Sequence, residues 1–274
     1  MKVWLRQAAG VAVGSLAMAA SAQAADDKPL WELGVGIGAL QLPHYRGSDQ
    51  SHTWLLPVPY AVYRGDLLKA DRDGARATLF DGDRQELNLS LAASAPTRSE
   101  DNRARQGMAD LKPTVEIGPV WNYTLLRADD HRLDLRWPVR AAFTLEGSPR
   151  HIGWVSNPHL NLDQRWNDWN VGLLAGPLFA DRRFHAYFYD VTGPDITADR
   201  PGFRSRGGYA GWQATAALSR QFGDAWLGLF VKADRVAGTA MADSPLVRER
   251  QQFSAGVAVT WVFARSSTLV PAVD

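Results

Sequence analysis

The amino-acid sequence predicts an all-β fold, a closed antiparallel transmembrane β-barrel that follows a cleaved signal peptide. Three observations support this: apolar and polar residues alternate along most of the chain, the N-terminus resembles a secretory leader, and tryptophan is abundant. The alternation is clearest in LDLRWPVRAAFTLE, residues 133–146, where every second residue from Leu133 to Leu145 is apolar. Because successive side chains of a strand point to opposite faces, this segment has one apolar and one largely charged face.

The same alternation occurs in soluble β-sandwiches, whose apolar faces meet in a core. Here it recurs in segments that reach the ~9–11 residues of a tilted transmembrane strand. In hydrocarbon every backbone polar group must be paired within the protein, so a sheet in the membrane has to close. The 11 tryptophans suit the aromatic girdles of such barrels.

The N-terminus has the three parts of a secretory signal peptide. Lys2 and Arg6 supply the positive charge, residues 8–20 are apolar, and Ala22-Gln23-Ala24 fits the cleavage pattern. An uncleaved inner-membrane anchor is the alternative. The expected organisation is a signal peptide at 1–24, a barrel at 25–263 and a short periplasmic tail at 264–274.

Charge and cysteine content exclude several classes of function. Loss of Lys2 and Arg6 with the leader leaves 28 basic against 29 acidic residues, so the net charge gives no reason to expect a nucleic-acid partner. The chain has no cysteine, which excludes disulfides and thiolate metal sites. The six histidines form no HxH or HxxxH pair, so neither a metal nor another cofactor is expected.

Ten segments carry the alternation, and each is expected to form one strand. The first five are residues 30–40 (apolar at odd positions 31–39), 53–70 (apolar at even positions 54–62), 75–95 (leucine at 87, 89 and 91), 112–127 (apolar at 115, 117, 121, 123 and 125) and 133–146. The other five are residues 151–165 (polar at odd positions 157–165), about 169–180, 208–221, 225–236 and 252–263 (apolar at odd positions).

The connections alternate in length, as in known barrels with short periplasmic turns and long outer loops. Short turns occur near Asp73, Asp130, Asn167 and Asp224. The longer loops are residues 41–52, 96–111, 181–207 and 238–251, with a brief exception at 147–150. Ten strands are expected, or twelve if Gly65 or the 181–207 loop conceals a hairpin. Six prolines inside these strands are expected at bulges or near the membrane boundary.

The polar faces of these strands supply the candidate lumen-lining residues. They favour either a selective channel lined by both charge signs or a small barrel filled by its own ion pairs. These residues are Glu32, Glu116, Arg132, Asp134, Arg136, Arg140, Glu146, His159, Asp163 and Arg165.

A hydrolytic site is the weakest functional reading of the sequence. His151, Ser156 and Asn157 invite comparison with a Ser/His/Asn outer-membrane phospholipase, and Ser156 has the parity of a lipid-facing residue. The local sequence context of such enzymes is absent, so no catalytic residue is assigned.

Four stretches together resemble one known family, the MipA/OmpV family of Gram-negative outer-membrane proteins. The matching stretches are 36–49 (with GIG and PHYRGSD), 59–66 (PYAVYRGD), 187–209 (with YFYDV, RP and GGY) and 242–247 (ADSPLV). The resemblance covers about residues 30–263 and implies a barrel in the outer membrane of a Gram-negative bacterium.

The resemblance also implies a role, because the named member of this family is similar to a scaffold that bridges a lytic transglycosylase and a murein synthase. We therefore expect a non-enzymatic scaffold whose partners are outer-membrane lipid and a periplasmic murein hydrolase or synthase. A narrow channel for small solutes and an outer-membrane lipid hydrolase are the alternatives. The expected docking surface is the set of periplasmic turns, with residues Asp71, Arg72, Asp73, Asp129, Asp130, Asn167, Asp168 and Asp224.

Overall fold

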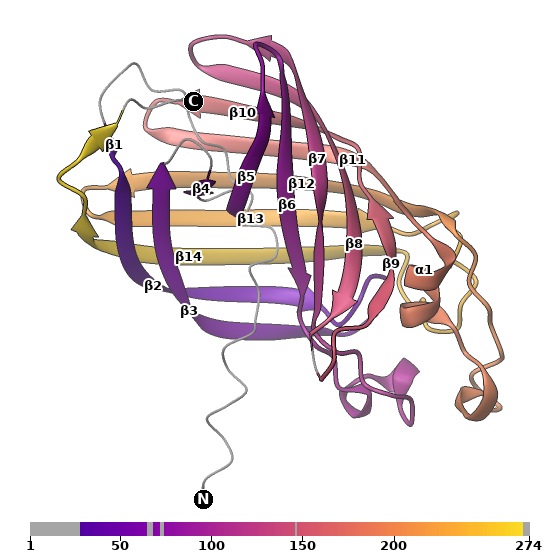
Figure 1. Ribbon diagram of the computed structural model, residues 1–274. Coiled ribbons are helices and arrows are strands. Elements are labelled where there is room, and N and C mark those ends of the chain that lie inside the picture. Colours follow the sequence, from indigo (N-terminus) through magenta and orange to yellow (C-terminus); the bar gives the residue numbers. More distant parts are fainter. Residues whose placement is uncertain (1–27, 65–67, 72–73, 146, 271–274) are drawn as a thin grey trace, which may run out of the picture.

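The computed structural model describes residues 28–64, 68–71, 74–145 and 147–270, which form one large antiparallel sheet that curves round on itself (Figure 1). The expected signal peptide and Glu146 lie outside these residues. The strands of the sheet are β2 (Trp31–Pro43), β3 (Ser51–Arg64), β4 (Leu68–Asp71), β5 (Gly74–Asp81), β6 (Gln85–Ser94), β7 (Thr114–Arg127), β8 (His131–Thr144), β9 (His151–Ser156), β10 (His159–Trp166), β11 (Trp169–Ala180), β12 (Gly208–Phe222), β13 (Ala225–Arg235) and β14 (Gln251–Arg265).

The strand pairing returns to its starting point, which makes the sheet a barrel. From β2 to β14 each strand pairs with the next along the chain, except that β9 and β10 each pair with β8 and β11, and β14 pairs with β2. Strands β9 and β10 are separated by Asn157 and Pro158 and together occupy one position between β8 and β11. The 13 strands therefore fill twelve positions in the ring.

The number ten was wrong, and the twelve-strand alternative describes the sheet. The expected strand at 53–70 is divided into β3 and β4, and that at 75–95 into β5 and β6. Asp81-Gly82-Asp83 supplies turn-forming residues between β5 and β6, and the Gly82 N–H donates to the Gln85 carbonyl. The alternation continues on both sides of so short a turn, so periodicity alone did not reveal it.

The outer surface of the barrel is apolar, as the alternation predicted. In β14, Phe253, Val257, Trp261 and Phe263 are exposed, while the intervening Thr260 is fully buried. Strand β3 is different because both its faces are apolar. Leu55 is 72% exposed on the outside, whereas Tyr60 and Val62 are buried on the inside.

The two ends of the barrel differ in the length of their connections. The turns that follow β7, β10 and β12 are two or three residues long, and the β10–β11 turn contains Asn167 at a φ of 52°. Such turns mark the periplasmic end. Close to this end, β1 (Lys28–Pro29) pairs with β15 (Leu269–Val270), so the two ends of the described chain lie together.

Loops at the opposite, outer end carry the main hydrophobic cluster and helix α1 (Arg182–Tyr189). The N-terminal cap of α1 is Asp181, whose carboxylate accepts a hydrogen bond from the Phe184 N–H at 2.8 Å. Within the described residues, no helix has the length and apolar character that a membrane crossing requires.

Candidate functional site

Loops from widely separated strands meet at the outer end of the barrel. The β2–β3, β6–β7 and β11–β12 loops begin four strand positions apart in a ring of twelve, which spaces them by thirds of the circumference. They nevertheless contact one another and the β13–β14 loop in a single cluster. Loops with this spacing can meet only across the end of the barrel. We call the four loops together the cap, because they cover the outer mouth.

Tyr189 at the end of α1 is the central residue of the cap. Its hydroxyl donates to the Arg46 carbonyl of the β2–β3 loop at 2.8 Å, and its own carbonyl accepts from the Ser244 hydroxyl of the β13–β14 loop at 2.8 Å. Its ring meets that of Tyr45 edge-on at 6.3 Å. The Tyr45 hydroxyl in turn donates to the Leu246 carbonyl. One aromatic pair therefore joins three loops.

Buried arginine side chains form further hydrogen bonds between the loops of the cap. Arg105 of the β6–β7 loop is 4% exposed and donates to the Phe188 carbonyl at 2.9 Å. Arg200 of the β11–β12 loop donates to the Ala104 and Gln106 carbonyls. Since a guanidinium offers five donors in a fixed plane, a few such side chains can satisfy many loop carbonyls at once.

Arg46 connects the cap to the barrel wall. Its Nε lies 3.1 Å from a carboxylate oxygen of Asp234 in β13, and its Nη1 donates to the Ala210 carbonyl at the start of β12. Asp234 is 4% exposed on its side chain and also pairs with Lys232 at 3.2 Å. The cap is thus joined to the barrel wall by a largely buried ion pair.

Burial favours the uncharged forms of Tyr189 and His185 in the cap. Burial raises the pKa of the Tyr189 hydroxyl to about 12, so this hydroxyl keeps its proton and remains a donor. Burial lowers the pKa of His185, which is 1% exposed, and its Nδ1 lies 2.6 Å from the Arg206 carbonyl. The native cap therefore contains neutral His185.

We expect acid to loosen the cap. Because the folded pKa of His185 lies below the unfolded value of 6.5, its contribution to stability is complete above pH 6.5 and declines as the pH falls below it. Amide hydrogen exchange in α1, corrected for intrinsic rates, should show protection falling between pH 7 and pH 5. The His185→Gln variant should flatten this dependence; an equally steep decline in that variant would assign it to other groups.

The charged wall of the lumen centres on Asp134, as the parity of β8 predicted. Its side chain is 1% exposed, and it accepts from Arg132 Nε at 2.8 Å and Thr124 Oγ1 at 3.0 Å. Arg136 lies between two carboxylates, 3.5 Å from Asp134 and 3.3 Å from Asp163. Four of the expected lumen residues therefore form one network.

Other expected lumen residues lie apart from this network. Arg140 pairs with Glu116 at 3.1 Å, and Glu32 accepts from the Tyr60 hydroxyl. The His159 ring nitrogen lies 2.7 Å from the Asn157 carbonyl. Arg165 is at the periplasmic end, where its guanidinium donates to the Asp129 carbonyl. We call the network around Asp134 and the Arg140–Glu116 pair the charged wall.

The other side of the lumen is apolar, which sequence parity did not reveal. Trp226, Phe230 and Ala258 form a buried inner cluster on β13 and β14, and Leu40 and Val58 pack against it. A second cluster joins Tyr60, Val62 and Val262. We call these two clusters, on β12–β14, β2 and β3, the apolar wall. The lumen is therefore amphipathic across its width.

The expected periplasmic turn residues divide into two groups. Asp129, Asp130, Asn167, Asp168 and Asp224 lie in short turns, where Asp168 pairs with Arg220 and Asp224 with Arg265, each at 2.7 Å. Asp71 ends β4, which runs antiparallel to β3 and therefore towards the outer end, so the β4–β5 turn is not among the periplasmic turns. Arg72 and Asp73 lie outside the described residues.

Ser156 and His151 do not form a catalytic pair of nucleophile and base, because each side chain bonds to other partners. The Ser156 hydroxyl donates to the Pro138 carbonyl and accepts from the Trp137 indole, at 3.1 and 3.0 Å. His151 Nδ1 instead faces the Arg183 guanidinium at 3.1 Å. Ser156 thus has a structural role between β8 and β9.

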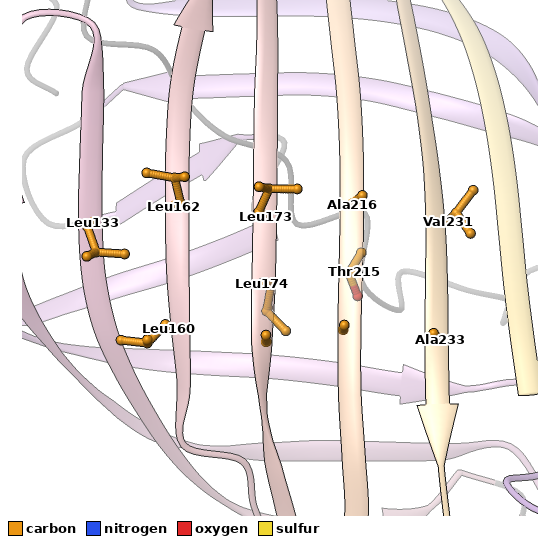
Figure 2. A pocket seen from close by; sticks show the side chains of 11 residues that line it. Leu133, Leu160, Leu162, Leu173, Leu174, Thr215, Ala216, Val231 and Ala233 are labelled. Carbon is orange, nitrogen blue, oxygen red and sulfur yellow. The ribbon is translucent and has the colours of Figure 1, made fainter. Parts of the chain in front are cut away.

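The outer surface of the barrel has an apolar groove of about 450 Å³ across β8 and β10 to β13 (Figure 2). Leucine and valine side chains border it, and the small side chains of Ala216 and Ala233 leave it hollow. Leu160 and Val231 beside it are exposed on the membrane-facing surface. Thr215 is the one polar residue among those that line the groove, which is otherwise formed by leucine, alanine and valine.

The fold resembles those of solved outer-membrane proteins at low sequence identity. An outer-membrane channel from Pseudomonas putida F1 matches with a TM-score of 0.44 and 12% identity, covering 85% of this chain and 96% of that one. A bacterial polysaccharide outer-membrane secretin matches with a TM-score of 0.43 and 9% identity, covering 87% and 100%. The outer-membrane phospholipase A of Escherichia coli matches with a TM-score of 0.33 and 12% identity, covering 85% and 90%. No curated protein sequence matches the chain.

Ring closure, an apolar outer surface and a polar inner network define an outer-membrane β-barrel protein of a Gram-negative bacterium. More particularly, the sequence model of the MltA-interacting protein MipA family matches residues 35–263, so the chain belongs to that family. The stretches that carried the resemblance now have a structural meaning. Tyr45, Tyr189, Arg200 and Leu246, which lie in three of them, are all cap residues.

Proposed function

We propose that this protein is a non-enzymatic scaffold in the outer membrane. It holds a periplasmic peptidoglycan-remodelling enzyme, a lytic transglycosylase or murein synthase, against the short turns at its periplasmic end, which we call the rim. The name of the family describes interaction with the murein enzyme MltA. The observation that carries the proposal is the cap, because the four packed loops cover the outer mouth and leave the periplasmic end as the accessible one.

The rim offers chemistry suited to a protein partner. Trp166 is 65% exposed beside the Asn167–Asp168 turn. Arg220 lies 4.7 Å from the Phe222 ring centroid and pairs with Asp168, so an arginine, a carboxylate and aromatic rings form one patch. Aromatic residues and arginine are enriched at the energetic centres of protein interfaces. The short turns hold these groups on a rigid frame.

We expect substitutions in this patch to abolish partner capture without affecting the barrel. A tagged double variant, Trp166→Ala with Arg220→Ala, should lose at least 90% of the transglycosylase or synthase that cross-linking recovers from native outer membranes. The matched control is Trp212→Ala, a comparably exposed tryptophan on β12, near the outer end. Gel mobility before and after boiling reports whether each barrel is folded. Undiminished capture by the folded double variant would refute the proposed docking surface.

A narrow channel is the second candidate, and the charged wall favours it. The Arg132, Arg136 and Arg140 side chains are 17–22% exposed although they line the inside, so water reaches them. Arg140→Glu would place a second carboxylate beside Glu116 and should shift ion selectivity towards cations in planar bilayers. Discrete conductance steps in the wild-type protein, altered by this variant, would favour the channel.

A further inference from the structure

The barrel wall is incomplete between β3 and β6. Among the residues that the structure describes, β3 pairs with β4 only at Tyr63 and Arg64, and residues 51–59 have a strand partner on their β2 side alone. The chain has two residues between Asp71, the end of β4, and Gly74, the start of β5. In the register that pairs Tyr63 with Ala70, two further residues would come no further than Tyr60, so the hairpin is too short to pair with residues 51–59. In Figure 1, β3 and β6 diverge with distance from the outer loops, and the short β4 and β5 lie between them only towards the far end.

The register of β3 identifies which backbone groups face this opening. The His44 N–H donates to the Gln50 carbonyl, so even-numbered residues of β3 bond to β2 and odd-numbered ones point to the opening. Two of the odd positions are Pro57 and Pro59, which have no N–H to leave unpaired. Proline with its nitrogen turned to the unpaired side marks an edge strand.

The opening has a defined upper boundary and lies at the level of the membrane. Above it, the β2–β3 and β6–β7 loops are joined by bonds such as Thr97 Oγ1 to the His44 carbonyl at 2.6 Å. Pro57 and Pro59 pair with Ile37 and Val35, whose side chains are exposed in the apolar outer band. We call this opening, between residues 51–59 and the end of β6, the lateral window.

The window lies where the two walls of the lumen meet. On its β3 side the inner face is the apolar wall, with Val58 and Phe230. On its β6 side the charged wall begins, with Glu116 and Arg140 on β7 and β8. Carbonyl groups at an unpaired edge require water or a polar ligand at membrane depth. A molecule with an apolar chain and a charged head matches the chemistry of both walls.

We propose that the barrel takes up a single-chain amphiphile with an ionised head group from the membrane through the lateral window, binding its chain on the apolar wall and its head on the charged wall. The cap closes the outer mouth, so the side of the barrel is the direct path from lipid to lumen. This activity uses the inside of the barrel and is independent of the periplasmic rim.

Photolabelling with a diazirine-bearing palmitic acid tests the proposal in the full-length protein in lipid nanodiscs. Because the chain has no cysteine, Leu55→Cys with Leu91→Cys allows a flexible bis-maleimide to bridge the two edges of the window. We expect labelling of peptides containing Val58 and Phe230, reduced at least tenfold by the bridge. Labelling of outward-facing Leu173 should not change, which gives an internal control.

A control cysteine pair and a substitution in the apolar wall provide the comparisons for this experiment. Bridging Leu33→Cys to Ala61→Cys, registered partners in the intact part of the wall, should leave inner labelling unchanged. Phe230→Ala, checked for folding by gel mobility, should weaken inner labelling about tenfold, whereas the neighbouring Leu229→Ala should not. Inner labelling that is absent, or that persists equally with the window bridged, overturns the proposal. Partner capture at the rim is measured separately and does not depend on either result.

Discussion

Replacing Asp134 with alanine should cause a large loss of barrel stability, larger than that of removing an exposed carboxylate. The carboxylate is 1% exposed on its side chain and is shared by Arg132, Arg136 and Thr124. Removing it leaves the guanidinium groups of Arg132 and Arg136 with one carboxylate fewer to balance their positive charge. Breaking a buried ion pair in this way costs about 3–5 kcal/mol. We expect about 3 kcal/mol, the lower end of this range, because the side chains of Arg132 and Arg136 are partly exposed, at 22% and 18%.

Urea unfolding of the barrel in lipid vesicles, followed by tryptophan fluorescence, measures this loss. The control is Asp168→Ala, which removes a carboxylate of similar ion-pair geometry from an exposed turn, where its side chain is 71% exposed. Exposed pairs contribute about 0.2–1 kcal/mol, so the control should unfold close to the wild type. Equal destabilisation by the two substitutions would mean that the lumen network does not stabilise the barrel.

The alternation predicted the barrel because membrane and lumen impose a period of two on every strand. In β14 it gave the outer residues Phe253, Val257 and Trp261 correctly, and the parity of β8 placed Arg132, Asp134 and Arg136 together. Where both faces of a strand are apolar, as around Val58 in β3, the alternation cannot decide which face is inside. The apolar wall was therefore not predictable from the period.

The cap could not be derived from local pattern at all. Tyr45 bonds to Leu246, 201 residues away, and Arg105 to Phe188, 83 residues away. No period in the sequence encodes a contact between loops, because loops lack a repeating geometry. The stretches that resembled the family were the available signal. They indicated that the loops matter, but their meeting over the barrel mouth depends on where the ring places each strand.

Tyr189→Ala should open the outer mouth. The side chain is 4% exposed, joins three loops and contributes one ring to the Tyr45 pair, so its truncation removes a core aromatic and the donor to the Arg46 carbonyl. Substitutions of this kind cost about 3–5 kcal/mol. The cost falls on the cap alone, because the strand pairing of the barrel does not involve this residue. The loops should then become sensitive to protease while the barrel still shifts on a gel after boiling.

Bilayer conductance decides what an opened cap means for function. If the cap is what closes the lumen, Tyr189→Ala should show conductance steps at least several times more frequent than those of the wild type. Tyr189→Phe keeps the ring and loses only the bond to Arg46, worth about 1 kcal/mol, so it should remain closed. A silent Tyr189→Ala barrel with protease-sensitive loops would show that the paired charges of the lumen close it by themselves. That outcome would support the scaffold over the channel, because the route through the barrel would be blocked at the charged wall even without its cap.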